Sequence, residues 1–272
     1  MSAATSDKSA DPVPLDTIPI SPDGGMTDAT NGATNGATNG ATNGTHDPEK
    51  IITVFDDPTN FNVKHALQHA WTLWFTKPPS GKQDWNELLK EVISFDSVEE
   101  FWGIYNNITP ASELAQKSDY HLFKKGVRPE WEDPQNKTGG RWAYTFKGGN
   151  RANDDVWLHI MLAAIGETLE EDADNEVMGV VVNIRKGFWR VGLWTRTAGQ
   201  APKKGAAAAA AANAAATTTT EGDKEEGKKR LEKIGRRFKS VLQLPEQELV
   251  EFSGHADSAH SGSSRAKAKF SV

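Results

Sequence analysis

Alternation of apolar and polar residues marks several strands in the central part of the chain. The pattern, strengthened by β-branched and aromatic residues, predicts strands over residues 70–77, 119–123, 141–147, 177–185, 188–195 and 249–253. Neighbouring strands follow one another without the intervening helices that parallel pairing needs. We therefore expect an antiparallel sheet.

Three segments have the periodicity or end signals of helices. Residues 97–107 open with the capping pair Ser97 and Glu100, and residues 228–242 are basic and amphipathic. Residues 154–167 carry one apolar helix face, made of Val156, Trp157, Ile160, Met161 and Ala164. Together these elements predict an α+β fold of one domain, a curved antiparallel β-sheet backed by helices on one face.

Two low-complexity segments bound and interrupt this domain. Residues 1–50 contain no aromatic residue, and residues 29–44 are four copies of Ala-Thr-Asn-Gly. Such a segment buries too little apolar surface to offset the entropy lost on ordering, so we predict a disordered tail. Residues 198–227 hold an alanine run, four threonines and a charged stretch, which we interpret as a loop insertion. The predicted globular domain spans residues 51–272 around that insertion.

The composition excludes several classes of protein. The net charge is −6, which argues against an RNA-coating protein that depends on many distributed phosphate contacts. The chain has no cysteine, which excludes disulfide scaffolds, thiolate zinc sites and cysteine nucleophiles. Neither an apolar run of membrane-spanning length nor a signal peptide is recognisable. The sequence predicts a soluble intracellular protein.

The tryptophans divide into two groups. All nine lie between Trp71 and Trp194, outside both low-complexity segments. Trp71, Trp74, Trp142 and Trp157 occupy positions where we expect core packing. Trp85 and Trp131 instead follow polar, proline-containing segments, so they are predicted on loops, where contact with a ligand is as plausible as packing.

Glu132 and a group of basic residues give these loop tryptophans a chemical context. A carboxylate such as Glu132 can accept both donors on the Watson–Crick edge of guanine, while aromatic rings stack on its faces. A cationic alkylated base would gain a further cation–π attraction. Asn183, Arg185, Lys186 and Arg190 span the junction of two predicted strands, where arginine suits phosphate. A solvated hairpin is the alternative interpretation of this second group.

Several motifs in the chain resemble those of the eukaryotic translation initiation factor 4E family, which binds the 7-methylguanosine cap of messenger RNA. The resemblance covers residues 61–197 and 228–272. The motifs that carry it are His65-Ala-Leu-Gln-His-Ala-Trp-Thr-Leu-Trp-Phe75, Phe95-Asp-Ser-Val-Glu-Glu-Phe-Trp102, Trp131-Glu-Asp133, Asn136-Lys-Thr-Gly-Gly-Arg-Trp142, Val181-Val-Asn-Ile-Arg185 and Ser253-Gly-His-Ala-Asp257.

The resemblance implies a role for each matching position of a cap site. Trp85 and Trp131 would sandwich the methylated guanine, Glu132 would accept its edge donors, and Trp194 would contact the methyl group. The residues implied in phosphate binding are Arg141, Asn183, Arg185 and Arg190. The family fold places three long helices on the convex face of the sheet, no reaction is implied, and neither a cofactor nor a metal is expected.

A second, partner-binding surface is implied on the helical face. There a helix with the pattern Tyr-x-x-x-x-Leu-Φ (Φ apolar), from the scaffold factor 4G or from repressor proteins, would meet His65, Val98, Trp102 and Leu158. Val98 and Trp102 are four residues apart and so share a helix face. Trp102 can also be interpreted as a core residue.

The chain departs from the family pattern at both surfaces. Ala66 and His159 stand where the family usually has proline and often glutamate; both changes touch the implied partner groove, and the sequence alone leaves open whether they alter partner choice. Between Arg185 and Arg190 the chain has Lys-Gly-Phe-Trp where relatives commonly have lysine and aspartate. Near the C-terminus, Ser263 is a candidate phosphorylation site beside the path of the messenger RNA.

Other functions remain open on sequence alone. A nucleotide-directed enzyme is one alternative, although the chain has neither a phosphate-binding Gly-x-x-x-x-Gly-Lys-Ser/Thr loop nor the glutamate-rich helix of metal-dependent pyrophosphate hydrolases. His255, Asp257 and His260 could bind zinc, but a solvated loop is the preferred interpretation. A repressive family member that binds caps without recruiting the scaffold is the other alternative. The resemblance implies a cytoplasmic location, with the nucleus open as a second one.

Overall fold

The computed structural model describes residues 51–57, 59–81, 84–147, 152–171, 174–199, 221–261 and 268–272. All of them belong to one compact unit, Lys50–Val272. The predicted tail over residues 1–50 and the alanine run of the insertion lie outside the described residues. None of the described helices is both long enough and apolar enough to span a bilayer.

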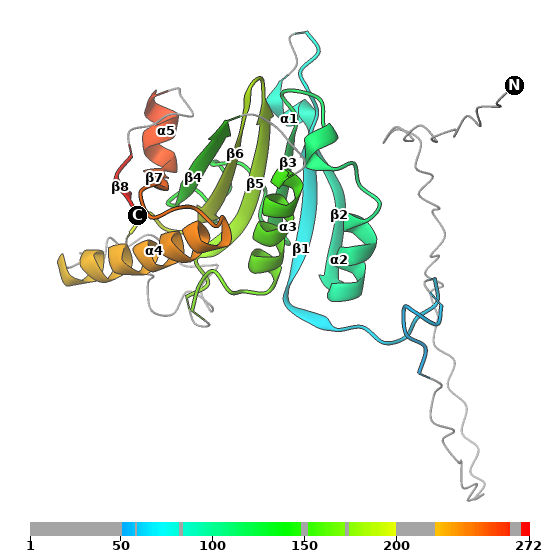
Figure 1. The fold of residues 1–272 in the computed structure, drawn as a ribbon. Coiled ribbons are helices and arrows are strands. Elements are labelled where there is room, and N and C mark those ends of the chain that lie inside the picture. The colour runs from blue at the N-terminus through cyan, green and yellow to red at the C-terminus, as the bar shows by residue number, and fades with distance from the viewer. Residues whose placement is uncertain are drawn as a thin grey trace, which may run out of the picture. The chain divides into compact units, whose positions relative to one another are not determined.

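The described strands form one antiparallel sheet, and they differ in length (Figure 1). Its spatial order is β2-β1-β3-β5-β6-β4-β7-β8, and every pair is antiparallel. The strands are β1 (Ala66–Thr76), β2 (Leu89–Ser97), β3 (Asp119–Lys124), β4 (Gly140–Lys147), β5 (Val177–Arg185), β6 (Phe188–Thr195), β7 (Glu251–Gly254) and β8 (Phe270–Ser271). The predicted α+β class with a curved antiparallel sheet is confirmed.

Helices α2, α3 and α4 lie on one face of this sheet (Figure 1). The helices are α1 (Trp85–Leu88), α2 (Val98–Tyr105), the 3₁₀ turn η2 (Ala111–Glu113), α3 (Ala152–Ile165), α4 (Glu221–Val241) and α5 (His255–Ser261). Gly235 lets α4 approach the sheet closely, because a Cβ atom there would lie 2.5 Å from the Trp142 ring. Because Trp142 points towards α4, its strand neighbours Arg141 and Ala143 must point to the other face of the sheet.

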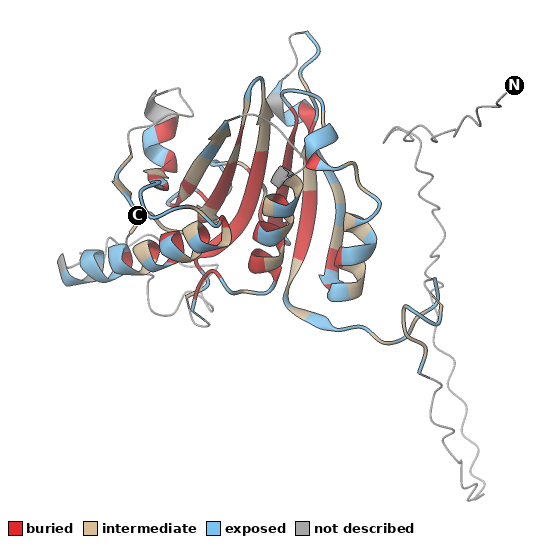
Figure 2. Cartoon of the chain, viewed as in Figure 1, coloured by how far each residue is buried: buried red, intermediate tan, exposed pale blue. Residues whose placement is uncertain are grey.

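The core fills the space between the sheet and these helices. Figure 2 shows the buried residues concentrated on the central strands and on the sheet-facing sides of the helices. Trp71 and Trp142 are fully buried and Trp157 is 2% exposed, as predicted for core tryptophans. Trp74 differs, because it is only half-buried and lies on the face of β1 opposite Trp71 and Leu73.

The largest element that the sequence pattern missed is β2. Its pairing with β1 shifts register by one residue, since Ile93 pairs with Leu73 but Glu91 pairs with Trp74. This β-bulge at Val92 breaks the strict alternation that reveals a strand in sequence. The predicted strand at 70–77 also begins earlier, at Ala66.

Helix ends follow local capping chemistry, with some differences from prediction. Ser97 caps α2 by accepting a hydrogen bond from the Glu100 backbone N–H (3.4 Å), while the Glu100 carboxylate accepts one from the Asp96 N–H (3.0 Å). Helix α4 begins at Glu221 rather than at residue 228, so the end of the predicted insertion is helical. Residues 255–261 form helix α5, which corrects the predicted solvated loop.

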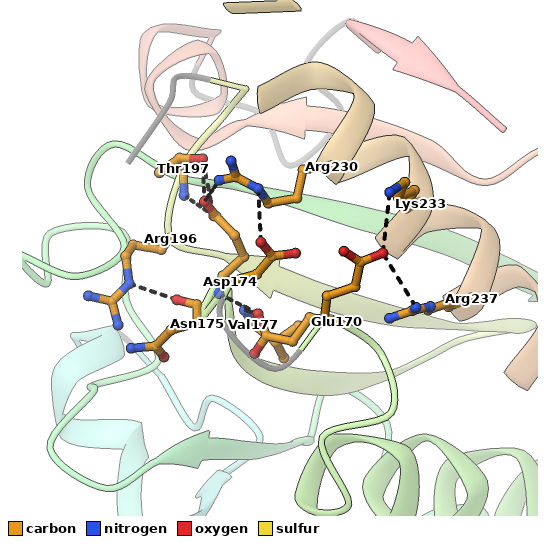
Figure 3. A network of polar contacts seen from close by, with 11 residues as sticks. Glu170, Asp174, Asn175, Val177, Arg196, Thr197, Arg230, Lys233 and Arg237 are labelled. Carbon is orange, nitrogen blue, oxygen red and sulfur yellow. Dashed lines mark hydrogen bonds and ion pairs between the residues drawn. The ribbon is translucent and has the colours of Figure 1, made fainter. Parts of the chain in front are cut away.

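A polar network fixes α4 to the segment between α3 and β5 (Figure 3). Arg230 contacts Asp174 at 3.1 Å and Glu176 at 3.2 Å, and Glu176 also accepts hydrogen bonds from Thr197 at 3.1 Å. The Glu176 side chain is 1% exposed, and this burial raises its carboxyl pKa. Because a buried carboxylate requires compensation, Arg230 both neutralises Glu176 and links α4 to the segment before β5.

Candidate functional site

A cavity of about 760 Å³ opens on the face of the sheet opposite α3 and α4. Seven of the eight predicted cap-site residues line it, namely Trp131, Glu132, Arg141, Asn183, Arg185, Arg190 and Trp194. The eighth, Trp85, is the first residue of α1, and its side chain lies outside the described residues. Its neighbours Asp84 and Asn86 both line the cavity, so the loop of Trp85 reaches the site.

Strand alternation explains why these residues meet. On β6, Phe188, Arg190, Gly192 and Trp194 face the cavity, while the residues between them are buried on the helical side. The same alternation places Arg141 and Ala143 of β4 and Asn183 and Arg185 of β5 on the cavity face. The cavity floor is thus one face of the adjacent strands β5, β6 and β4, extended by Asp119 and His121 of the neighbouring strand β3.

The loop that carries Trp131 and Glu132 is braced from below by Asn136. This side chain is fully buried, and its amide donates to the carbonyl oxygens of Arg128 (2.8 Å) and Glu130 (2.9 Å). Asp133 adds a further brace by accepting the Arg128 N–H at 2.9 Å. The braces hold a short turn in which Trp131 remains 38% exposed and lines the cavity.

Arg128 connects this loop to the start of α1, next to Trp85. Its guanidinium donates to the Glu130 carboxylate (2.7 Å) and to the Asn86 side-chain oxygen (3.4 Å). It also lies 5.8 Å from the centre of the Trp74 ring. Trp74, predicted as core, therefore supports the rim of the cavity from the open face of β1.

Charge is divided unevenly along the cavity. The loops contribute the carboxylates of Asp84, Glu130 and Glu132. The strands contribute Arg141, Arg185 and Arg190, together with the Asp119 carboxylate that pairs with Arg185. The Glu132 carboxylate contacts the Trp131 indole N–H. A ligand that matches this division carries positive charge or hydrogen-bond donors at one end and several negative charges at the other.

The arginines are held by specific contacts. Arg185 binds the buried carboxylate of Asp119 with both terminal nitrogens, at 2.6 Å and 3.2 Å. Arg190 donates through Nε to the Thr145 hydroxyl at 3.1 Å. Burial and the neighbouring Arg190 lower the pKa of Arg141 to about 10, so Arg141 stays charged near neutral pH. An anionic ligand would offset the repulsion between these two cations.

Trp194 packs against two rings. The His255 imidazole of α5 lies 4.2 Å from it, centre to centre, and Phe123 meets it edge-on at 5.4 Å. Burial, with a smaller contribution from Arg141, lowers the pKa of His255 to about 3, which keeps the ring neutral. Its Nε2 atom has no hydrogen-bond partner among the described residues, although His255 lines the cavity.

The zinc alternative receives no support from this placement. His255 faces Trp194, while Asp257 instead pairs with Lys269 at 3.0 Å. The His260 side chain lies outside the described residues. Over the part of the chain that the structure describes, no cluster of three or more histidine or acidic side chains is arranged to hold a metal.

The predicted partner-binding residues lie on the helical side of the sheet. His65 and α2 are directly joined, because the Val98 N–H donates to the His65 carbonyl and the His65 imidazole contacts Glu99 at 2.6 Å. Val98 is 36% exposed and Trp102 37% exposed, and the Trp102 ring rests on Phe101. Leu158, on α3, is half-buried. Trp102 therefore has an accessible side, unlike the core tryptophans.

Other cavity residues did not emerge from the sequence. Asp119, His121, Phe188, Gly192 and His255 all line the cavity. Asp119 and His121 alternate with apolar residues in the sequence, but polar strand residues are common on any exposed face. Phe188 and Gly192 are not polar, so they gave no sign of a binding site. His255 could not be placed, because its position depends on the packing of α5 against β4 and β7. The predicted phosphorylation site Ser263 lies outside the described residues.

The comparisons with known proteins agree with this architecture. The family model "Eukaryotic initiation factor 4E" matches residues 66–270. Eukaryotic translation initiation factor 4E-1 of Schizosaccharomyces pombe is 52% identical over 81% of this chain and 88% of its own length. Among solved structures, eIF4E-3 of C. elegans, in complex with the 4E-binding protein Mextli and a cap analog, is 32% identical with a TM-score of 0.61, covering 77% of this chain and 100% of its own. Ascaris suum eIF4E-3 with an m7G cap is 34% identical with a TM-score of 0.59, covering 77% of this chain and 98% of its own. The chain belongs to the eukaryotic initiation factor 4E family.

Proposed function

We propose that this protein binds the 7-methylguanosine 5′ cap of messenger RNA in the cavity and recruits translation partners through its helical face. The observation that carries the proposal is the division of charge in one cavity between loop carboxylates with an exposed tryptophan and strand arginines. The cap has the matching form, a cationic base joined to a chain of phosphates. The cap complex of the related Ascaris protein supports this choice of ligand.

The base would be held by rings and one carboxylate. Trp131 and Trp85 stack on the two faces of the methylated guanine, and each stack contributes about 1–3 kcal/mol. Glu132 accepts the two donors of the base edge after leaving the Trp131 indole N–H. Trp194 contacts the methyl group. The positive charge of the methylated ring adds a cation–π attraction that unmethylated guanine lacks.

The phosphates would extend along the floor formed by β4, β5 and β6. Arg185, with its orientation fixed by Asp119, adds positive charge on this floor, and Arg190 and Arg141 lie beside it. Asn183 supplies an amide at the same floor. These local cations allow an acidic chain of net charge −6 to attract an anionic ligand.

We infer that this site binds without catalysing a reaction. The translation initiation factor family to which the chain belongs supports a binding role. Incubating the protein with 7-methylguanosine triphosphate and recovering the nucleotide intact is the expected result. A hydrolysed product would favour the nucleotide-directed enzyme instead.

The helical face would bind a Tyr-x-x-x-x-Leu-Φ helix from factor 4G or from repressors, through His65, Val98, Trp102 and Leu158. The related C. elegans protein in complex with the 4E-binding protein Mextli supports this kind of partner. A repressive role without scaffold recruitment is the competing candidate, since Ala66 and His159 depart from the family pattern and adjoin His65 and Leu158 in the sequence. Failure of such a peptide to bind would select the repressive role. The initiation role places the protein in the cytoplasm.

The site assignment is tested by changing its most specific residue. Glu132→Gln keeps the size of the side chain but replaces one acceptor by a donor, so it should weaken binding of 7-methylguanosine triphosphate by tenfold or more. Trp131→Ala should do the same by removing one stack. Glu113→Gln, an acidic side chain outside the cavity, is the matched control and should bind as the unchanged protein does. Equal affinities for all the variants would contradict the site.

A further inference from the structure

Phe188 is an aromatic residue on the cavity face that the cap assignment leaves without a role. It is the first residue of β6, lines the cavity and is half-buried. Its strand neighbour Trp189 points the other way into the core, where it packs on Phe146 at 5.2 Å. Among the described residues, no aromatic ring packs against Phe188. Core packing therefore does not account for this ring.

The position of Phe188 along β6 indicates which part of a ligand it would meet. Phe188, Arg190 and Trp194 share one face of the strand. At about 3.3 Å per residue, Arg190 lies about 13 Å and Phe188 about 20 Å from Trp194 along the strand. With the methylated base at Trp194 and phosphates at Arg190 and at Arg185, which pairs with Phe188, the nucleoside attached to the far end of the triphosphate begins at the level of Phe188.

The neighbours of Phe188 on both adjoining strands carry positive charge. It pairs directly with Arg185 of β5 and with Lys147 of β4. Residues paired in this way point to the same face of an antiparallel sheet. Lys147 is exposed. A ring between two cationic side chains is the combination by which proteins hold single-stranded nucleic acid, with the base stacked and the backbone neutralised.

From this arrangement we propose that the Phe188 ring stacks on the base of the first nucleotide after the cap. Lys147, beside Phe188, would contact the phosphate next to that nucleotide. This proposal rests on the proposed cap-binding function and extends it from the cap itself to the RNA chain.

The test compares three ligands by isothermal titration calorimetry at one salt concentration. They are 7-methylguanosine triphosphate, the cap dinucleotide m7GpppA, and the same dinucleotide with an abasic ribose in place of the adenosine. Each is titrated into the full chain carrying Phe188→Ala, Phe188→Leu or Phe188→Tyr. Phe55→Ala, at an aromatic side chain that is 94% exposed and outside the cavity, serves as the control.

The expected result is selective. Phe188→Ala and Phe188→Leu weaken m7GpppA about tenfold more than they weaken the triphosphate or the abasic ligand, a difference of about 1.4 kcal/mol. Phe188→Tyr binds m7GpppA as tightly as the unchanged protein does, because it keeps a flat ring. Phe55→Ala has no such selectivity.

Two other results would overturn the proposal. Equal losses for all three ligands would mean that Phe188 only shapes the phosphate site, and an unchanged affinity for m7GpppA would mean that the ring contacts no base. Failure of the unchanged protein to bind 7-methylguanosine triphosphate is a separate result, which would refute the cap-binding function itself and this proposal with it.

Discussion

Replacing Asn136 with alanine removes the side chain that braces the loop of Trp131 and Glu132 without touching the cavity residues themselves. The Asn136 amide makes two hydrogen bonds to loop carbonyl oxygens, at 2.8 Å and 2.9 Å. At about 0.5–1.5 kcal/mol for each bond, the variant should lose about 1–3 kcal/mol of stability. If most of that loss falls on ordering the loop, the binding geometry is populated less, and the apparent affinity for 7-methylguanosine triphosphate falls by about tenfold.

Two measurements separate this effect from general destabilisation. Urea denaturation gives the free energy of unfolding, and tryptophan-fluorescence titration at 20 °C gives the affinity while the variant is still folded. Gln135→Ala is the control, because its side chain donates only one exposed hydrogen bond, at 3.3 Å to the Gly126 carbonyl. A variant at Asn136 that loses stability but keeps its affinity within about twofold would refute the idea that this residue positions the loop.

Three further predictions concern the partner surface, pH and the α4 contact. Trp102→Ala should abolish binding of a Tyr-x-x-x-x-Leu-Φ peptide in a pull-down while cap affinity stays nearly intact, and loss of both would show that Trp102 is structural. The pKa of His255 is lowered to about 3 by burial, so below its ordinary pKa of 6.5 the unfolded state binds a proton that the folded state does not. Stability should therefore fall as the pH decreases from 6.5 towards 3, by at most about 1.4 kcal/mol per pH unit from this group. His255→Gln should flatten that slope in urea denaturation, whereas parallel curves would contradict the assignment. Arg230→Met leaves the Glu176 carboxylate buried without its cation and should lower the free energy of unfolding by about 3–5 kcal/mol. Lys233→Met, which breaks an exposed pair with Glu171, should change it by about 1 kcal/mol or less, and equal effects would count against the role of Arg230.

Strand alternation predicted one part of the cavity floor, the shared face of Asn183 and Arg185, and both residues line the cavity. Arg185 and Asn183 are two residues apart on one strand, so their shared face follows from the period of the strand alone. The loop position of Trp131 followed from its flanking prolines and acidic residues. Resemblance to a family then joined these local features into one site, which spacing within each segment could not do.

The remaining features depend on contacts between distant segments. The β-bulge at Val92 explains why the sequence pattern did not predict β2, because the extra residue interrupts the alternation of apolar and polar residues along the strand. Trp74 lies in an apolar run that predicts a core position, but the Arg128 guanidinium lies over its ring on the cavity side of the sheet. The contact of the His255 ring with Trp194 depends on how α5 packs against the sheet, which the sequence of α5 alone does not specify.

Selectivity for the methylated base tests the central claim most directly. Tryptophan fluorescence of the full chain would be titrated with 7-methylguanosine triphosphate and, in parallel, with unmethylated guanosine triphosphate, which has the same phosphates. The account predicts strong quenching and at least a tenfold preference for the methylated nucleotide, equivalent to about 1.4 kcal/mol. Equal, weak responses to the two nucleotides would contradict it, because the arginines alone would then account for all the binding.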